Sequence, residues 1–444
     1  MIQLPGIHTI YFIGIGGISM SGLAQILHAN GYKVRGSDRQ ANPQTEALIT
    51  LGIVIDHGQT DDTITSDIDL IVFTAAIHPD NPQYVAAKQL GIPMYSRAKL
   101  LGLIIDHYPG SVCIAGTHGK TTTTTMIAHL IMSLGVKPTV SVGAHVAAIG
   151  GNFLLGDSPY LVVESCEYND SFLEFRPHVG VILNLEFDHP DHFRDLAQMT
   201  QSFKDFAKQV SGVLIVNREI PNWEALVADT KAQVITFGEQ DGDIRFAMKP
   251  NGGFNLAKNG DTLPYELPVL GKHNVANATA ALAALTALGL DATAAHFNTY
   301  VNPQRRLQHK GVTAHGAVVI DDYAHHPTEI MVTLAALREA YPEHTIHCLF
   351  QPHTYSRTLG LLDDFATAFG DSDVVYLLDI YGAREIDTGT VHTRDLLTRI
   401  TNTQTQYFRD FEAAEKFFEK NLSNTDLLIT MGATNVNIIG ESLV

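Results

Sequence analysis

Residues 116–122 read Gly-Thr-His-Gly-Lys-Thr-Thr and have the clearest chemical use of any segment in this sequence. An apolar run at 111–115 precedes them, and apolar residues at helical spacing follow at 126–131. A glycine turn between a strand and a helix binds phosphate through backbone N–H groups and the positive end of the helix. Lys120 can contact the outer phosphates, and the Thr121 hydroxyl can ligate Mg²⁺. The motif therefore predicts a site for a nucleoside triphosphate.

This glycine turn is shorter than the general phosphate-binding pattern, which places four residues between its first glycine and the Gly-Lys pair. Here only Thr117 and His118 lie between the two glycines. The short form points to a narrower set of ATP users. A turn that merely joins a strand to a helix is the alternative, but it gives no reason for Lys-Thr at the start of the helix.

Carboxylate and imidazole groups end two further predicted strands, at 160–164 and 179–185. Glu164 ends the first, and the segment 184–189, Asn-Leu-Glu-Phe-Asp-His, ends the second. The carboxyl ends of parallel strands meet at one edge of a sheet, so these groups are expected beside Lys120. A carboxylate and a neutral imidazole next to a triphosphate can hold a divalent metal. A solvated acidic rim is the alternative. Spacing also leaves other carboxylates open as ligands, namely Glu167, Glu186, Asp188 and Asp191.

A second glycine turn, at 14–17, follows an apolar run at 8–13. Asp38 ends the next predicted strand, 22 residues beyond Gly16, which suits an acid bonded to a ribose. Ser19 stands at the third glycine position of G-x-G-x-x-G. The pattern therefore favours a nucleotide diphosphate in general over NAD in particular, and a turn without a ligand is the alternative.

Residues 271–277 place Asn274 and Asn277 on one face at the start of a predicted helix. An amide side chain offers both a donor and an acceptor, as recognition of adenine requires. Helix capping by Asn274 is the other interpretation.

Polar side chains also gather at two strand ends further along the chain. Residues 321–327 read Asp-Asp-Tyr-Ala-His-His-Pro, and residues 351–357 read Gln-Pro-His-Thr-Tyr-Ser-Arg. Loop capping accounts for two or three such side chains. Loop capping does not explain why five such side chains occur together, namely Tyr323, His325, His326, His353 and Arg357.

Strands alternate with helices along the chain, which implies parallel sheets with helices on both faces. The predicted fold class is α/β in three domains: a Rossmann-like N-terminal domain, a central P-loop ATPase-like parallel sheet and a Rossmann-like C-terminal domain. The predicted boundaries are 1–107, 108–310 and 311–444, with a linker at 107–111. Other strands are predicted at 32–38, 69–75, 92–95, 316–320, 344–350, 374–378 and 426–430. Helices are predicted at 19–30, 271–288, 328–340, 358–369 and 411–421, and a β-ribbon or loop at 248–267.

Composition restricts the class of protein. A chain of 444 residues suits several domains. Its formal charge of −18 argues against binding to nucleic acid, which needs a basic surface. No apolar run is long enough to span a membrane, and the first residues do not resemble a secretory signal. Three cysteines, far apart and without metal-ligand spacing, are expected to be buried free thiols in the cytoplasm.

Taken in order, these segments resemble the Mur ligases over essentially the whole chain, and most of all the members that add L-alanine. The resemblance implies domains that bind a UDP-sugar (1–107), bind ATP (108–310) and close over ATP and the amino acid (311–444). It implies ATP-dependent joining of L-alanine to the carboxylate of UDP-N-acetylmuramic acid through an acyl phosphate, with Mg²⁺, in peptidoglycan precursor synthesis. A monomer or homodimer is expected. The motifs lie at 14–24, 36–38, 80–82, 116–122, 271–278, 305–306, 321–329 and 351–353.

The resemblance also implies roles for individual residues. The catalytic set is Lys120, Glu164, His189, His325 and Arg357. The ATP set is Gly116, Thr117, His118, Gly119, Lys120, Thr121, Thr122, Asn274, Asn277, Arg306 and Asp322. The UDP-sugar set is Gly14, Gly16, Gly17, Ser19 and Asp38. The amino-acid set is Tyr323, His325 and Arg357. Thr121 and Glu164 would hold one Mg²⁺, and His189 a second.

Two positions depart from the family pattern. The family commonly has arginine at the position of Thr354, so a bidentate clamp on a carboxylate is missing there. Arg384 is a candidate substitute. Near the C-terminus, the common Gly-Ala-Gly reads Gly-Ala-Thr at 432–434, which exchanges a permissive backbone position for the Thr434 hydroxyl.

Three other functions remain open from the sequence. A sister ligase that attaches a preformed tripeptide to the same UDP-sugar would share the ATP site. A nicotinamide-dependent dehydrogenase would use the first glycine turn. A non-catalytic UDP-sugar sensor would be consistent with the departures at Thr354 and Thr434.

Overall fold

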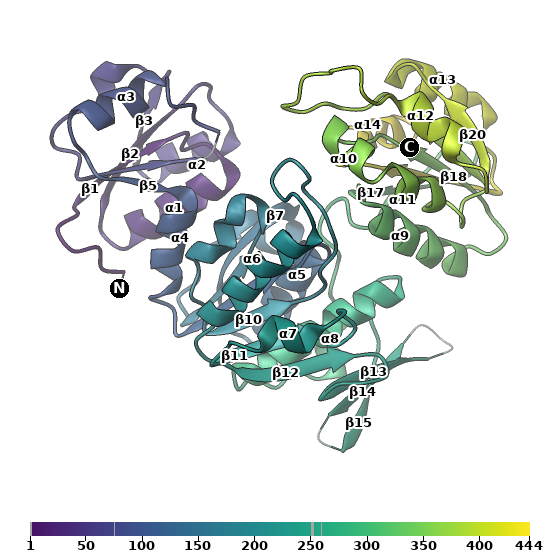
Figure 1. Cartoon of the computed structure of the whole chain (residues 1–444), viewed down its shortest axis with the longest axis horizontal. Coiled ribbons are helices and arrows are strands. Elements are labelled where there is room, and N and C mark those ends of the chain that lie inside the picture. The colour runs from purple at the N-terminus through teal and green to yellow at the C-terminus, as the bar shows by residue number, and fades with distance from the viewer. Residues whose placement is uncertain (1, 75, 250–252, 259) are drawn as a thin grey trace.

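The computed structural model describes residues 2–74, 76–249, 253–258 and 260–444. Three sheets follow one another along the chain, and Figure 1 shows them as three bodies with the central one between the other two. Helices separate most of the strands, and most neighbouring strands are parallel, so the predicted α/β fold class is confirmed. Ala75, at the end of the strand predicted at 69–75, and residues 250–252 and 259 of the predicted ribbon lie outside the described residues.

The N-terminal sheet has the order β3-β2-β1-β4-β5, and all its strands are parallel. β1 is fully buried, as its sequence Thr-Ile-Tyr-Phe-Ile favours. The strand order reverses at β1, and such a switch point is where open α/β sheets bind ligands. The elements are β1 Thr9–Ile13, α1 Ile18–Ala29, β2 Lys33–Asp38, α2 Pro43–Thr50, β3 Val54–His57, η1 Asp61–Thr63, β4 Leu70–Phe73, α3 Pro82–Gln89, β5 Met94–Ser96 and α4 Arg97–Ile105.

The central sheet has the order β15-β14-β13-β12-β11-β10-β6-β9-β7-β8. β6 lies between β10 and β9 and is parallel to both, so these strands end at one edge. The β13–β15 ribbon confirms the β-ribbon alternative. The strands are β6 Gly110–Ala115, β7 Thr139–Val146, β8 Gly151–Leu154, β9 Tyr160–Glu164, β10 Val179–Ile182, β11 Val213–Asn217, β12 Gln233–Gly238, β13 Ile244–Met248, β14 Phe254–Lys258 and β15 Asp261–Tyr265. The helices are α5 Lys120–Ser133, η2 Ala147–Ile149, η3 Tyr168–Glu174, α6 Leu196–Gln209, α7 Trp223–Val227, α8 Lys272–Ala287 and η4 Ala294–Phe297.

The C-terminal sheet has the order β16-β17-β21-β18-β19-β20, with only β16 antiparallel to its neighbour. The single helix predicted at 358–369 is wrong: Leu361 has non-helical angles and separates α10 from α11. Gly360, a poor helix former, favours this break. The elements are β16 Gln308–Val312, β17 Val318–Asp322, α9 Pro327–Ala340, β18 Thr345–Phe350, α10 Tyr355–Gly360, α11 Leu362–Thr367, β19 Val374–Leu377, α12 Thr393–Arg399, β20 Gln404–Tyr407, α13 Phe411–Asn421, β21 Asp426–Met431 and α14 Asn437–Ser442.

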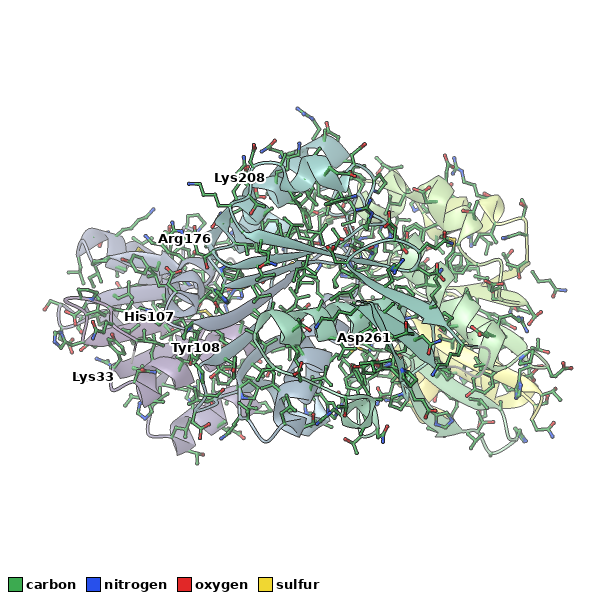
Figure 2. All side chains as sticks on the ribbon, turned by 90° about the horizontal axis from the view of Figure 1, so that it is seen from below. Lys33, His107, Tyr108, Arg176, Lys208 and Asp261 are labelled. Carbon is green, nitrogen blue, oxygen red and sulfur yellow. The ribbon has the colours of Figure 1, made fainter. Side chains whose placement is uncertain are left out.

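The junction between the first two domains is tightly packed. α4 approaches η3 so closely that a Cβ on Gly102 would lie 2.1 Å from the Glu174 carbonyl oxygen. Figure 2 shows His107 and Tyr108 at this junction, where the N-terminal and central ribbons meet. His107 accepts a hydrogen bond from the N–H of Gln3 on the N-terminal side. We propose that the first boundary lies here, near residue 109.

The second predicted boundary, after residue 310, falls inside β16. β16 pairs with β17 of the C-terminal sheet, so its residues belong with that sheet. We propose that the C-terminal domain begins just before Gln308. Within the described part of the chain, no helix has both the length and the apolar character that crossing a membrane requires.

Candidate active site

The phosphate loop connects β6 to α5 through two glycines in the left-handed region. Gly116 has a φ of 139° and Gly119 a φ of 79°. A Cβ on Gly119 would also lie 2.5 Å from the Asn277 side-chain oxygen, so only glycine fits there. Asn184, just after the neighbouring strand β10, fixes the loop through two hydrogen bonds. It accepts one from the His118 N–H at 2.8 Å and donates one to the His118 carbonyl at 3.1 Å. The loop is therefore preformed.

Lys120 begins α5 and bonds to a buried carboxylate. Its Nζ donates to Glu167 Oε2 at 2.8 Å and to Oε1 at 3.1 Å. Burial opposes the charge on Lys120, but the Glu167 carboxylate outweighs burial and raises the lysine pKa. Lys120 is therefore a cation at neutral pH, and Glu167 holds it at the loop.

Thr121 and Glu164 lie together, as expected from the neighbouring carboxyl ends of β6 and β9. The Thr121 hydroxyl donates to Glu164 Oε1 at 3.0 Å, and the Gly143 N–H donates to Oε2 at 2.7 Å. Arg306 of the C-terminal region donates to the Thr121 hydroxyl at 3.4 Å. Thr121 and Glu164 present oxygen atoms only, which is the ligand type that Mg²⁺ prefers.

His189 lies apart from this pair, against Glu167. Its Nε2 is 3.5 Å from Glu167 Oε1, and a φ of 55° turns the chain sharply at this residue. A sulfur of Cys166, an oxygen of Glu167 and a nitrogen of His189 all lie within 4.8 Å of one another. Two of the alternative ligands lie beside His189: Glu167, and Asp188, whose Oδ2 is 3.7 Å from His189 Nε2.

A cavity of about 460 Å³ lies between the phosphate loop and the C-terminal domain. Asn274 and Asn277 of α8 line one side, and Arg306 and Asp322 line the other. Helix α8 begins after Gly271, so Asn274 is not its N-cap. Burial raises the pKa of the Asp322 carboxyl to about 6, although Arg306 opposes this shift. The size and mixed lining suit a nucleotide.

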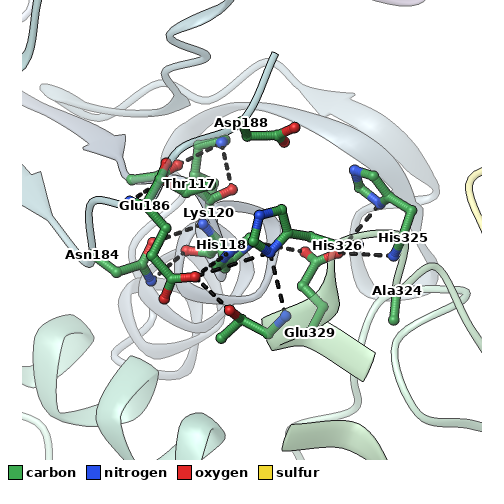
Figure 3. A network of polar contacts seen from close by, with 12 residues as sticks. Thr117, His118, Lys120, Asn184, Glu186, Asp188, Ala324, His325, His326 and Glu329 are labelled. Atoms are coloured by element: carbon green, nitrogen blue, oxygen red, sulfur yellow. Dashed lines mark hydrogen bonds and ion pairs between the residues drawn. The ribbon is translucent and has the colours of Figure 1, made fainter. Parts of the chain in front are cut away.

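His118 lies between carboxylates of two domains, as Figure 3 shows. Its Nε2 is 3.4 Å from Glu186 Oε2, and its Nδ1 is 3.3 Å from Glu329 Oε1. Burial opposes protonation, but the two carboxylates outweigh it and raise the pKa of His118 to about 9. His118 is therefore an imidazolium at neutral pH. Because Glu329 belongs to α9, this cation joins the phosphate loop to the C-terminal domain.

Arg357 and Asp188 form a second buried link between these domains. Arg357 donates from Nε to Asp188 Oδ1 at 2.8 Å and from Nη2 to Oδ2 at 3.2 Å. Burial alone would raise the pKa of Asp188, but Arg357 and His189 hold it well below its usual range. Nearby, burial lowers the pKa of His325 to about 4, and its Nδ1 lies 3.0 Å from the Tyr323 carbonyl. His325 is therefore neutral at pH 7.

The first glycine turn lies at the switch point of the N-terminal sheet. The Gly16 N–H donates to Asp38 Oδ2 at 2.8 Å, so Asp38 positions this turn. Gly17 is the N-cap of α1 and leaves the first N–H groups of that helix without a side-chain cap. Arg97 of α4 donates to the Ser19 hydroxyl at 3.1 Å and places a cation beside them. This arrangement suits an anionic ligand.

Family models match the chain in three consecutive stretches. The Mur ligase family catalytic domain matches residues 9–109, the Mur ligase middle domain matches 114–285, and the Mur ligase glutamate ligase domain matches 305–434. The chain belongs to the Mur ligase family.

Named Mur ligases are similar over their full length. A UDP-N-acetylmuramate–L-alanine ligase of Agathobacter rectalis is 46% identical, with 98% of this chain and 97% of the relative covered. One of Caldanaerobacter subterraneus subsp. tengcongensis is 42% identical, with 99% and 98% covered. The crystal structure of the UDP-N-acetylmuramate–alanine ligase of Thermotoga maritima has a TM-score of 0.77 at 26% identity and covers 98% of each chain.

The structure brings most of the expected Mur ligase residues to two places. The ATP set surrounds the phosphate loop and the cavity, and the UDP-sugar set lies at the first glycine turn. Tyr323, His325 and Arg357 lie where the C-terminal domain meets residues 186–189. The remaining alternative ligands have other partners: Glu186 bonds to His118, Asp188 to Arg357 and Asp191 to Tyr168.

Three residues of the candidate site, Arg97, Cys166 and Glu329, are not among the predicted site residues. Arg97 and Cys166 each lie just after a strand, and only this position in the sequence could have marked them as site residues. Glu329 lies inside the motif at 321–329, three residues after His326, where it completes the capping box of α9. Of the two departures from the family pattern, the structure gives a role to Thr434 and no explanation for Thr354. The Thr434 hydroxyl accepts from the Val436 N–H at 3.3 Å and stabilises the turn before α14. Thr354 has a φ of 67°.

Proposed function

We propose that this chain is an ATP-dependent ligase that joins L-alanine to the carboxylate of UDP-N-acetylmuramic acid, in peptidoglycan precursor synthesis. The observation that carries the proposal is the full-length similarity, at 46% identity, to a relative of that name. The phosphate loop with its cationic Lys120 and His118, beside a cavity of nucleotide size, supports the use of ATP. Ligation needs ATP because a free carboxylate has no leaving group.

In the proposed reaction, the muramate carboxylate attacks the γ-phosphate of ATP, which gives an acyl phosphate and ADP. The amine of L-alanine then attacks the acyl carbon, and phosphate leaves. Positioning and charge neutralisation dominate catalysis of phosphoryl transfer. We assign these tasks to Lys120 and His118 on the loop and to Arg306 from the C-terminal side. Their buried setting strengthens each charge interaction.

The residues also fit Mg²⁺. Thr121 and Glu164 supply a hydroxyl and a carboxylate, both oxygen ligands, and His189 is the proposed ligand of a second Mg²⁺. Bound Mg²⁺ would neutralise charge on the phosphate oxygens. The protein groups already hold each other in place, because Gly143 fixes Glu164 and Lys120 fixes Glu167.

The N-terminal domain is the proposed site for the UDP part of the sugar nucleotide. The first glycine turn, the start of α1 and the Arg97 guanidinium offer donors and positive charge to the diphosphate. Burial lowers the pKa of Arg97, and Cys166 of the central domain lies close enough to oppose that shift, so Arg97 is near the central domain. This placement suits a substrate that spans both domains.

A coupled phosphate-release assay tests the proposal. The protein is supplied with ATP, Mg²⁺ and UDP-N-acetylmuramic acid, and L-alanine is compared with glycine, L-serine and a tripeptide. Phosphate release that depends on L-alanine supports the proposed reaction, and a preference for the tripeptide would favour the sister ligase. Reduction of a nicotinamide cofactor would favour a dehydrogenase, and no release with any acceptor would favour a sensor. Sedimentation analysis tests the expected monomer or homodimer.

Glu164→Ala is expected to raise the Mg²⁺ concentration needed for half-maximal turnover by about tenfold or more, because it removes a direct oxygen ligand. A Mg²⁺ titration of turnover measures this effect. Glu174→Ala is the matched control in the same domain, since Glu174 lies at the end of η3. A Mg²⁺ titration that matches the parent protein would remove Glu164 from the metal site.

Arg384→Ala tests whether Arg384 replaces the arginine missing at Thr354. The Arg384 guanidinium lies 4.7 Å from the centre of the Tyr168 ring and 3.6 Å from Asp191, and its side chain is 69% exposed. A charge-assisted carboxylate contact contributes about 1.5–3 kcal/mol, so KM for one carboxylate substrate should rise roughly tenfold or more. Steady-state kinetics measures it. Parental KM values for both L-alanine and UDP-N-acetylmuramic acid would mean that Arg384 does not act as the substitute.

A further inference from the structure

A thiol, a carboxylate and an imidazole meet beside Lys120, where β9 and β10 end. Cys166 Sγ, a Glu167 oxygen and a His189 nitrogen lie within 4.8 Å of one another. Glu167 is fully buried, whereas Cys166 and His189 are partly exposed, so an ion can reach the group from solvent. The other cysteines, Cys113 and Cys348, are fully buried in cores.

We propose that Cys166, Glu167 and His189 form a binding site for a thiophilic divalent cation such as Zn²⁺. Mg²⁺ prefers oxygen ligands, whereas a thiolate and an imidazole nitrogen select Zn²⁺ and Co²⁺. Three protein ligands leave the fourth tetrahedral position open to water or to a substrate oxygen. Metal–ligand bonds of about 2.0–2.3 Å place tetrahedral ligands roughly 3.3–3.8 Å apart, so small side-chain rotations complete the site.

Binding of this cation changes the surroundings of Lys120. Glu167 accepts both of its close bonds from Lys120, at 2.8 and 3.1 Å. A metal ion on Glu167 takes up one carboxylate oxygen and repels the lysine ammonium. The Cys166 thiol releases its proton to solvent and binds as the thiolate, without any redox step. Bound Zn²⁺ therefore displaces a lysine of the phosphate loop and inhibits nucleotide use.

A second group of possible ligands has different chemistry. His118, Glu186 and His326 also bring ligand atoms within 4.8 Å, but this group has no sulfur. Glu186 is moreover occupied by His118 and by the Thr328 hydroxyl. A charge-transfer band from thiolate to metal consequently reports the Cys166 site and not this one.

Titration of the full chain with Co²⁺, followed by absorption spectroscopy, tests the proposal. One equivalent of Co²⁺ is expected to produce a thiolate-to-Co²⁺ charge-transfer band and the visible bands of tetrahedral Co²⁺. Added Zn²⁺ is expected to displace Co²⁺ and remove both sets of bands. Cys166→Ser should lose the charge-transfer band. His326→Gln, which removes a ligand from the other group, should keep it. Thermal unfolding of each variant verifies that it is folded.

Zn²⁺ protection and inhibition provide a second readout. Zn²⁺ is expected to slow alkylation of Cys166 by iodoacetamide, read by mass spectrometry. In the presence of excess Mg²⁺, Cys166→Ser should raise the Zn²⁺ concentration that halves phosphate release by about tenfold or more. Absence of the band in the parent protein, or its persistence in Cys166→Ser, would overturn the proposal. The spectroscopic result does not depend on the ligase activity, so failure of one is distinguishable from failure of the other.

Discussion

Replacing Lys120 with alanine is expected to reduce turnover by at least about 10²- to 10³-fold, because it removes a largely buried cation from the phosphate loop. Binding of UDP-N-acetylmuramic acid should stay close to that of the parent protein, since its proposed site lies on a different sheet. Phosphate release measures turnover, and isothermal calorimetry measures binding of the sugar nucleotide. Loss of that binding would contradict the division into separate UDP-sugar and ATP domains.

The same change should also destabilise the protein. Glu167 is fully buried, and without Lys120 its charge is left with only His189 nearby. Breaking a buried ion pair from one side costs about 3–5 kcal/mol. Lys120→Met combined with Glu167→Gln removes both charges, so this double variant should recover stability while turnover stays lost. Recovery of turnover in the double variant would mean that Lys120 acts only by neutralising Glu167.

Lys208→Ala is the matched control. It removes the same charge from the same domain, near the end of α6, where Figure 2 shows Lys208 at the edge of the molecule. Lys208 forms an ion pair with Asp205. Exposed pairs of this kind contribute about 0–1 kcal/mol. Both turnover and thermal stability of Lys208→Ala should therefore match the parent protein.

Arg357→Ala is expected to have the second-largest effect, because it breaks the buried pair between the central and C-terminal domains. Arg357 and Asp188 side chains are 6% and 4% exposed. Asp188 would remain as an unpaired buried charge at a cost of about 3–5 kcal/mol, which loosens the docking of the C-terminal domain. Hydrogen exchange should increase at residues 185–193 and along α10. Turnover should fall in parallel, by about 10²-fold or more.

Removing both charges separates docking from substrate contact. Arg357→Met with Asp188→Asn leaves no unpaired charge, so hydrogen-exchange protection should return. If Arg357 also contacts a substrate carboxylate, turnover of this double variant stays low; turnover restored to the parental value would make Arg357 a positioning residue only. Arg399→Ala, which breaks an exposed pair with Asp363 in the same domain, is the control. Its exchange and turnover should not change.

Local features of this protein could be predicted from its residues alone. The strand, glycine turn and helix at 110–133 follow from a few adjacent residues, because positive φ angles and the helix start are short-range properties. The three-domain α/β class followed from alternating strand and helix patterns and from motif order. The break at Leu361 did not, because the apolar residues Leu359, Leu361, Leu362 and Phe365 continue through it in the sequence.

The partners of the charged residues could not be predicted, because they depend on how the strands and domains pack. Glu164, Glu167, Glu186 and Asp188 all follow strands that end at one sheet edge, and spacing does not distinguish them. Strand order places β9 and β10 on the two sides of β6, and this arrangement sets Glu164 on Thr121 and Glu167 on Lys120.

Contacts between the domains determine the partners of the remaining carboxylates. Glu186 and Glu329 share His118, and Asp188 binds Arg357. The contacts His118–Glu329 and Asp188–Arg357 each join residues more than 160 positions apart. Such contacts depend on how two separately folded sheets meet, and no local pattern encodes that geometry. The sequence gives the chemical type of each side chain but not its electrostatic environment. The charge of His118 and the neutrality of His325 result from burial and from partners in another domain.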